Sequence, residues 1–198
     1  MKADWVNKFE KEGTYKETFT DINGDESEID FMHQAADFKY YENGDTKAVK
    51  LPYENGLSMV VVLGDTKNIL NDIHNNKMTS KLVDVSLPKF KAEYSIDYVN
   101  ILKNMGIEKA FDNQNADFSL MLENYPERIK IDSVLQEAMI DVDEKGTEAA
   151  AATVAVVPKS ALSVDEEVIE FRADKPFTYY VLDDSGNVYF AGRYVKAA

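Results

Sequence analysis

The residue types that most often carry out chemistry are sparse in this chain. It has no cysteine, which excludes disulfide bridges, cysteine-ligated metal and thiol catalysis. His33 and His74 are the only histidines. His33 follows Met32 at the start of an expected strand, and His74 lies among asparagines near an expected helix end. We therefore interpret both as structural or surface residues.

Metal and cofactor motifs are also missing from the sequence. Asp21, Asn23 and Asp25 resemble the beginning of a calcium loop, but Glu26 stands where that loop needs its glycine, so an acidic turn is expected. There is no His-Glu-x-x-His motif, no nucleophile elbow, no phosphate loop and no dinucleotide fingerprint. The sequence predicts no metal, no cofactor and no enzyme. A hydrolase, as one further hypothesis, has no set of residues to support it.

The segment of residues 146–163 has the most unusual pattern. Its first half contains four consecutive alanines, Ala149–Ala152, which favour a helix, and it continues through Thr153–Val157, which favours a strand. Read as a strand, one face carries only small or modest uncharged residues, from Thr147 to Val157, and Glu148 falls on the other face. Two interpretations follow from the residues: a flexible linker, or a loop that can enter a sheet as a strand.

Composition and charge limit the partners of the chain. Its 198 residues carry 22 basic and 36 acidic side chains, and the net charge of −14 offers no basic patch to nucleic acid. With 44% hydrophobic residues the chain can bury a core, and the acidic residues are expected on a solvated surface. The longest apolar run, Met59–Leu63, is too short to span a membrane, and the N-terminus lacks a signal-peptide pattern.

Most of the strands expected in the rest of the chain, which must position residues 146–163, are joined as hairpins. Asn43-Gly44 between two β-rich runs predicts a hairpin, and Leu57–Leu63 reads as a buried strand. Asp183–Gly186 predicts a turn between two further strands, 177–182 and 188–194.

Helices are expected to be few and short. Asp65 or Thr66 is expected to cap one that reaches about Ile73, and Ser95 to cap another that Gly106 ends. Pro88 lies inside an extended run and predicts an edge strand. Strands and helices are thus interspersed without repeats, which indicates the α+β class.

Several motifs, in order along nearly the whole chain, resemble the C-terminal half of a serpin. The run of residues 143–153 resembles the serpin hinge, and the run of residues 171–177 resembles the family signature. Further matching segments are Trp5 with Phe9, Leu51–Tyr53 with the strand after it, Leu87–Phe90, Leu102–Phe111 and Phe190–Tyr194. The resemblance implies a partial serpin domain over residues 1–198, with mixed sheets, short helices and a reactive-centre loop at about 144–166.

The resemblance also implies a function: suicide inhibition of serine proteases, in which the loop is cleaved and then inserts into the main sheet. It implies hinge roles for Glu144, Gly146, Thr147, Glu148, Ala149, Ala150, Ala151 and Ala152, and structural roles for Trp5, Gln136, Phe171, Ala173, Asp174, Pro176 and Phe177. The small hinge residues favour an inhibitory member, because bulky or charged residues would raise the cost of entering the sheet.

The bond that the protease would cleave is placed by spacing within the resembled family. Sixteen positions after Glu144 comes Ser160, so the bond would be Ser160–Ala161 and would suit an elastase- or subtilisin-like protease. The alternative, Lys159–Ser160, would suit a trypsin-like protease. By the same resemblance an extracellular location is expected.

Two departures from the family pattern give further expectations. Gln136 stands where many serpins have a histidine that hydrogen-bonds beneath the main sheet, so a pH-sensitive contact would be lost there. The chain is also about half the length that the fold needs, and the N-terminal helical half is the expected missing partner. Without it the chain is not expected to trap a protease, and a non-inhibitory binding or scaffold protein is the alternative.

Overall fold

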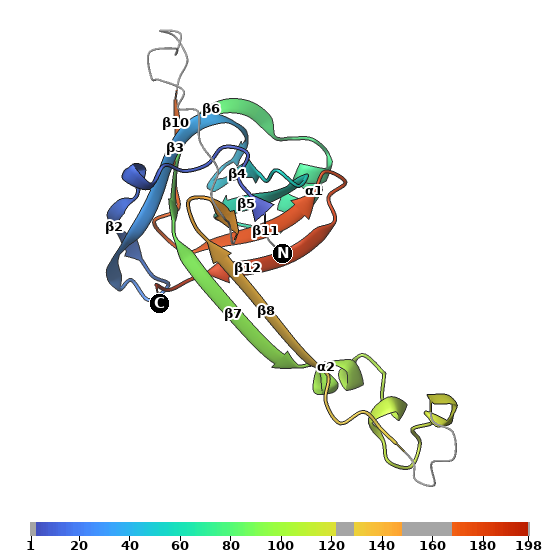
Figure 1. The fold of residues 1–198 in the computed structure, drawn as a ribbon. Coiled ribbons are helices and arrows are strands. Elements are labelled where there is room, and N and C mark those ends of the chain that lie inside the picture. Colours follow the sequence, from blue (N-terminus) through green and yellow to red (C-terminus); the bar gives the residue numbers. More distant parts are fainter. Residues whose placement is uncertain (1–2, 122–128, 148–167, 198) are drawn as a thin grey trace. The chain divides into compact units, whose positions relative to one another are not determined.

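The computed structural model describes residues 3–121, 129–147 and 168–197, and it divides into two compact units (Figure 1). The first unit holds residues 1–91 and 141–198, and the second holds residues 92–140. Among the described residues, none of the helices combines the length and the apolar character that a membrane span requires.

An eight-stranded sheet forms most of the first unit. In spatial order its strands are β10 (Ile169–Arg172), β6 (Thr79–Pro88), β3 (Glu26–Asn43), β4 (Thr46–Pro52), β5 (Leu57–Leu63), β11 (Phe177–Asp183) and β12 (Val188–Tyr194), and β2 (Tyr15–Thr20) pairs with β3. β10 pairs with β6 in parallel, whereas the other neighbours are antiparallel. The mixed sheets with few short helices confirm the α+β prediction.

Both predicted hairpins are present in this sheet. Asn43 pairs with Thr46 at the end of the β3–β4 hairpin, and Gly44 takes a φ of 58°, a conformation that suits glycine. The β11–β12 turn is held by Asp183, whose carboxylate accepts hydrogen bonds from the backbone of Ser185 and Asn187. Local turn chemistry therefore sets the register of these strands.

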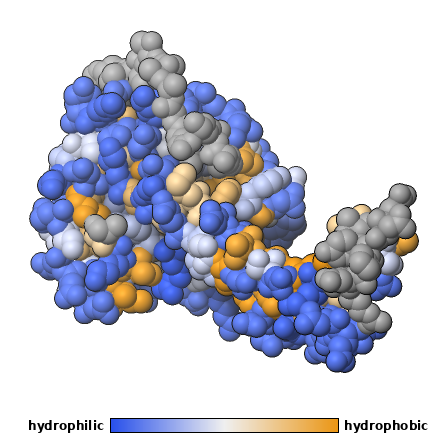
Figure 2. All heavy atoms as spheres, turned by 60° about the horizontal axis from the view of Figure 1, so that its bottom comes forward, coloured by the Kyte–Doolittle hydropathy of each residue, from blue (hydrophilic) through white to orange (hydrophobic). Residues whose placement is uncertain are grey.

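The core of the first unit lies where the apolar faces of the strands meet. Val60 and Val61 are completely buried in β5, as the apolar run predicts. Beside β5, an aromatic cluster forms between Phe90 and the strands β11 and β12, and the ring centroid of Phe90 lies 5.7 Å from that of Phe177 and 5.1 Å from that of Tyr194. On the face drawn in Figure 2, hydrophilic residues surround separate apolar patches, as expected for so acidic a chain.

The expectation that Pro88 marks an edge strand is wrong. β6 lies inside the sheet, between β10 and β3. Pro88 is the last residue of the strand, so its missing N–H removes no hydrogen bond from the middle of the ladder.

A second sheet has the order β1 (Ala3–Asp4), β9 (Gly146–Thr147), β8 (Leu135–Val142) and β7 (Phe90–Asp97). The helical elements are η1 (Lys11–Gly13), α1 (Ile69–His74), α2 (Val99–Asn104), η2 (Lys109–Phe111) and η3 (Ser119–Met121). The expected cap at Ser95 is wrong, because the strand β7 continues through that residue. Asp97 instead accepts a hydrogen bond from the N–H of Val99 at the start of α2. Neither Asp65 nor Thr66 caps α1, since Asn68 is the residue before its first position, Ile69.

Candidate functional site

The start of the predicted loop segment forms a tight hairpin with the strand before it. The Asp143 carboxylate accepts hydrogen bonds from the backbone N–H of Lys145 at 2.9 Å and of Gly146 at 3.1 Å. Thr147 then pairs with Val142 of β8, so the chain reverses and runs back along β8. A short polar turn thus converts the end of one strand into the start of the next.

β9 lies between two strands from distant parts of the sequence. Gly146 and Thr147 pair antiparallel with Asp4 and Ala3 of β1 on the side opposite β8. The first two residues after the turn therefore already occupy a strand position inside this sheet. Of the predicted hinge, Glu148–Ala152 lie outside the described residues, as do Lys159, Ser160 and Ala161.

Trp5 links β1 to the hairpin through two hydrogen bonds. Its side chain is 1% exposed and stacks on Tyr53 with ring centroids 4.3 Å apart. The indole N–H donates to the carbonyl oxygen of Asp143 at 2.9 Å, and the backbone N–H of Trp5 donates to the carbonyl oxygen of Lys145 at 2.9 Å. Trp5 thus ties the end of β1 to the turn that precedes β9.

Glu144 is the buried acidic residue of the turn, with 6% of its surface exposed. Its carboxylate accepts hydrogen bonds from the Thr14 hydroxyl at 3.0 Å and from the Lys89 ammonium at 3.1 Å. Burial by itself raises the pKa of the Glu144 carboxyl, but hydrogen bonds from the backbone, Lys89 and Thr14 outweigh it and bring that pKa below its ordinary value. The turn therefore carries a buried charge that is paired and hydrogen-bonded.

Sequence reasoning missed Thr14 and Lys89 as members of this site. Lys89 stands in the Leu87–Phe90 segment, which the sequence marks only as a family segment, and Thr14 carries no signal of its own. Both are brought to Glu144 by the fold, from 55 and 130 positions away.

Gly146 stands where the neighbouring backbone leaves no room for a side chain. Its φ is 147°, and a Cβ atom there would lie 2.1 Å from the carbonyl oxygen of Ala3. The glycine therefore allows β1 and β9 to approach each other closely.

We expect Gly146→Ala to separate β9 from β1 and to lower the free energy of unfolding by about 2–4 kcal/mol, because the methyl group meets backbone that cannot move aside. Thermal unfolding together with amide exchange at Asp4 and Trp5 measures this. Gly24→Ala is the matched control, since Gly24 also has a positive φ, 87°, but nothing lies within 4 Å of its Cβ position. Equal losses in the two variants would contradict the proposed close fit.

The other residues with expected structural roles lie in two places. Phe171 and Phe177 are buried in β10 and β11 of the large sheet, and the buried Ala173 follows β10, where its N–H donates to the carbonyl oxygen of Ser86 at 2.9 Å. The carbonyl oxygen of Asp174 accepts from the N–H of Thr20 at 2.9 Å, and Pro176, which directly precedes β11, is half-buried. Gln136 lies in β8 with an exposed side chain, so its expected contact beneath the main sheet stays a prediction.

No group of acidic or histidine side chains in the described ranges is arranged to hold a metal ion. Asp21 forms the expected acidic turn, since its carboxylate accepts hydrogen bonds from the backbone of Asn23 and Asp25. The hairpin site is a tight turn in which hydrogen bonds and packing hold the start of β9 between β1 and β8.

Comparison with known proteins identifies the fold that this hairpin belongs to. The family model described as "Serpin (serine protease inhibitor)" matches residues 1–197. The chain belongs to the serpin family. Serpin-like proteins of Methanosarcina mazei and Thermococcus kodakarensis are 37% and 35% identical to it, and each alignment covers 98% of this chain and 47% of the relative. This serpin chain therefore spans about half the length of the curated relatives it matches.

Solved serpin structures give the same result. The native state of the thermophilic serpin tengpin superposes with a TM-score of 0.80 at 28% identity, over 98% of this chain and 53% of tengpin. Serpin48 of the insect Tenebrio molitor, described as highly specific, has a TM-score of 0.78 at 32% identity, over 100% and 54% of the two chains. Thyroxine-binding globulin in complex with thyroxine, at 23% identity and a TM-score of 0.80, shares the fold. The family model is described in terms of serine protease inhibitors, and the thyroxine complex shows that the same fold also occurs in a protein that binds a small ligand.

Proposed function

We propose that the protein carrying this chain is a suicide inhibitor of a serine protease, with residues of about 144–166 as its reactive-centre loop. The observation that supports this most is the position of β9. The loop segment enters the sheet between β1 and β8 at Gly146 and Thr147, so continued strand pairing from Thr147 onward would draw the following residues into the same gap. The run of small residues after Thr147 keeps the cost of that insertion low.

In the proposed mechanism the protease serine attacks the carbonyl carbon of Ser160, the bond to Ala161 breaks, and Ala161 leaves as a free amine. The protease then remains bound to the Ser160 carbonyl as an ester. Insertion of residues 147–159 as a strand moves the protease away from the position where it cleaved the loop. The active site of the protease is distorted in this step before water can hydrolyse the ester. With Ser160 before the cleaved bond, the proposed target is an elastase- or subtilisin-like protease. Cleavage at Lys159–Ser160 would instead indicate a trypsin-like target. The extracellular location is part of the same proposal and follows from the family resemblance.

The test mixes the full-length protein with elastase, subtilisin and trypsin in turn. We expect a complex that survives denaturant with elastase or subtilisin, and a released C-terminal peptide that begins at Ala161. Gel electrophoresis with mass spectrometry measures both. A peptide that begins at Ser160, with a trypsin complex, would move the reactive bond to Lys159. Complete cleavage without any complex would contradict inhibition.

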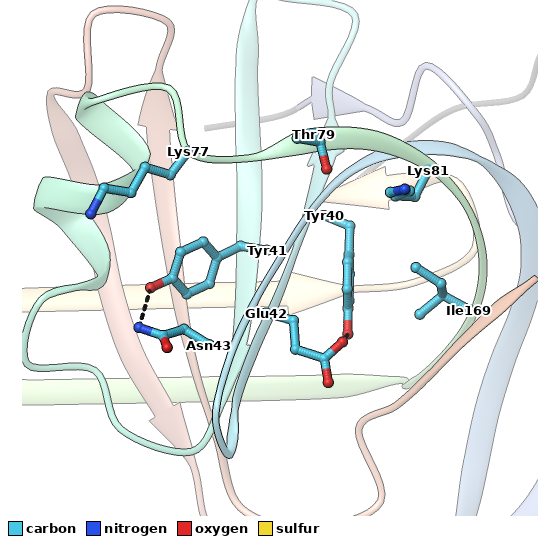
Figure 3. A pocket seen from close by; sticks show the side chains of 8 residues that line it. All are labelled: Tyr40, Tyr41, Glu42, Asn43, Lys77, Thr79, Lys81 and Ile169. Atoms are coloured by element: carbon cyan, nitrogen blue, oxygen red, sulfur yellow. Dashed lines mark hydrogen bonds between the residues drawn. The ribbon is translucent and has the colours of Figure 1, made fainter.

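A pocket in the first unit favours a second candidate function, the binding of a small ligand by a non-inhibitory member. It has a volume of about 500 Å³ and is lined by Tyr40, Tyr41, Glu42, Asn43, Lys77, Thr79, Lys81 and Ile169 (Figure 3). Many of its polar groups are already engaged with one another: the Tyr40 hydroxyl donates to Glu42 at 2.7 Å, and the Asn43 amide donates to the Tyr41 hydroxyl at 3.4 Å. Burial and Glu42 raise the pKa of the Tyr40 phenol, which therefore stays neutral. Because these groups satisfy each other, inhibition remains the better-supported function.

A further inference from the structure

Five of the residues that line the pocket of the first unit share one face of the eight-stranded sheet, at the end of the β3–β6 pairing. Tyr40 stands opposite Thr79 in the last pair of these two strands. Glu42 follows Tyr40 on the same face of β3, and Lys81 follows Thr79 on the same face of β6. Ile169 of β10 completes the group, because its partner is the next residue of β6 on that face. The hairpin site described above uses none of the five.

This half of the pocket has an apolar side. The Tyr40 ring is 4% exposed, and Phe38 and Val83, which stand opposite Lys81 and Ile169 on the same face, are buried. Figure 3 shows Lys81 and Ile169 on the same side of the Tyr40 ring. The volume of about 500 Å³ lies in the range of sites for small organic molecules, which combine apolar walls with a few polar groups. Because a planar group packs well on an aromatic ring, this half suits a molecule with a planar apolar body.

Two of the three charged side chains that line the pocket are balanced by neighbours. The Glu42 carboxylate accepts a hydrogen bond from the Tyr40 hydroxyl at 2.7 Å and lies 3.6 Å from the Lys47 ammonium. The Lys77 ammonium donates to the Asp72 carboxylate at 2.7 Å. Both charges are therefore paired before any ligand binds.

The third charged side chain, Lys81, brings a positive charge that is not balanced. Within the described ranges of the chain it has neither an ion pair nor a hydrogen bond. The residue opposite it in β3 is the apolar Phe38, which offers no acceptor. A lysine ammonium has three donors and no acceptor, so the group that best completes this half of the pocket is an anion.

We propose that the pocket binds a small organic carboxylate with a planar apolar body, and that Lys81 pairs with its carboxylate group. A singly charged anion matches the single unbalanced ammonium. A doubly charged phosphate would meet more repulsion from Glu42, which lines the same pocket. The apolar body would pack against the Tyr40 ring and Ile169. This binding rests on the second candidate function, for which it supplies the class of ligand, and it does not depend on protease inhibition.

A bound carboxylate is also expected to hold β10 more firmly to the sheet. β10 is four residues long, begins at Ile169, and in the described sheet pairs with one neighbour, β6, in parallel. A ligand that contacts Ile169 together with Tyr40 and Lys81 joins β10 to β3 and β6. Because such a ligand binds the closed arrangement better than an opened one, it stabilises the closed arrangement.

Calorimetric titration of the full-length protein with naphthoate tests the binding. Naphthamide is the matched ligand, because it has the same apolar body without the charge, and acetate has the charge without the body. Lys81 is exposed to solvent, so we expect naphthoate to bind about three- to tenfold more tightly than naphthamide, and acetate to bind more weakly than either. Changes in the NMR chemical shifts of Tyr40, Lys81 and Ile169 should mark the site.

Lys81→Gln should lower the affinity for naphthoate by the same three- to tenfold and leave the affinity for naphthamide unchanged. Lys39→Gln is the matched control, because Lys39 directly precedes Tyr40 in β3 but lies on the other face of the sheet. Hydrogen exchange measures the effect on β10. With naphthoate at about ten times its Kd, we expect the protection of residues 169–172 to rise by about three- to tenfold.

Several results would overturn this binding site. Equal affinities of the unchanged protein for naphthoate and naphthamide would exclude the pairing with Lys81, as would equal losses in Lys81→Gln and Lys39→Gln. No binding of naphthoate, or shift changes confined to other residues, would exclude the pocket. Unchanged protection of residues 169–172 would exclude the effect on β10.

The comparison of the two ligands uses the unchanged protein, so it holds even if a variant does not fold, which far-UV circular dichroism shows. A protein that binds naphthoate as expected but traps no protease would contradict only the proposed inhibition. One that traps a protease but does not bind naphthoate would contradict only the carboxylate site.

Discussion

Thr147→Arg is expected to convert the protein from an inhibitor into a substrate of its protease. Thr147 is the last described residue of the loop segment and already pairs with both Ala3 and Val142. On the alternation expected for this strand, its side chain belongs to the face of small residues, and an arginine there would bury a charge if the strand advanced. Slowed insertion gives water time to hydrolyse the acyl-enzyme. We expect the number of inhibitor molecules consumed per protease trapped to rise by tenfold or more.

Titration of a fixed amount of protease with increasing amounts of variant measures this number, and gel electrophoresis shows cleaved protein in place of complex. Glu148→Arg is the matched control, because it places the same side chain one position later, on the opposite face of the expected strand. Thr147→Ser is a second control that keeps the residue small. Retained trapping by Thr147→Arg, or equal loss in Glu148→Arg, would contradict the insertion argument.

Glu144→Lys is expected to destabilise the protein strongly. It replaces a buried carboxylate by an ammonium group that faces the ammonium of Lys89, which now lies 3.1 Å from Glu144. Breaking a buried pair costs about 3–5 kcal/mol, and since the Lys89 side chain is 37% exposed, we expect about 2–4 kcal/mol. For a chain of this length that lowers the melting temperature by roughly 5–15 °C.

Thermal unfolding measures the loss, and the double variant Glu144→Lys with Lys89→Glu should recover part of it by restoring an opposite pair. The lowered pKa of Glu144 makes the same site sensitive to acid. Its contribution is present above the ordinary carboxyl pKa and is lost as pH falls through the lowered value, so the stability difference between the unchanged protein and Glu144→Gln should shrink at low pH. A difference that is constant with pH would show that the charge of Glu144 does not stabilise the hairpin.

The sequence by itself determined the local features of this protein. Asn43-Gly44 and Asp183–Gly186 predicted the hairpins, because a glycine or an aspartate in a tight turn acts through its immediate neighbours. The apolar run Leu57–Leu63 predicted a buried strand for the same reason. The ordered series of motifs also indicated the serpin family, and the family comparison confirms it. Each turn signal, the apolar run and each single motif of the series is contained in a few consecutive residues.

Predictions from local sequence patterns were wrong where strand pairing with distant parts of the chain determines the structure. Pro88 suggested an edge strand, but β10, which lies far along the sequence, pairs with β6 over Val83–Ser86 and so places β6 inside the sheet. Ser95 suggested a helix cap, but strand pairing carries β7 past it. In both places long-range strand pairing overrode a residue's local preference.

Only the tertiary structure decided which charged groups meet. Glu144 is paired with Lys89, and Glu17 with Arg172, across 55 and 155 positions of sequence. In so acidic a chain, with 36 carboxylates, composition gives no means to single out these two. The sheets bring them together because strand register places side chains from separate strands on one face, and burial then makes each pairing necessary.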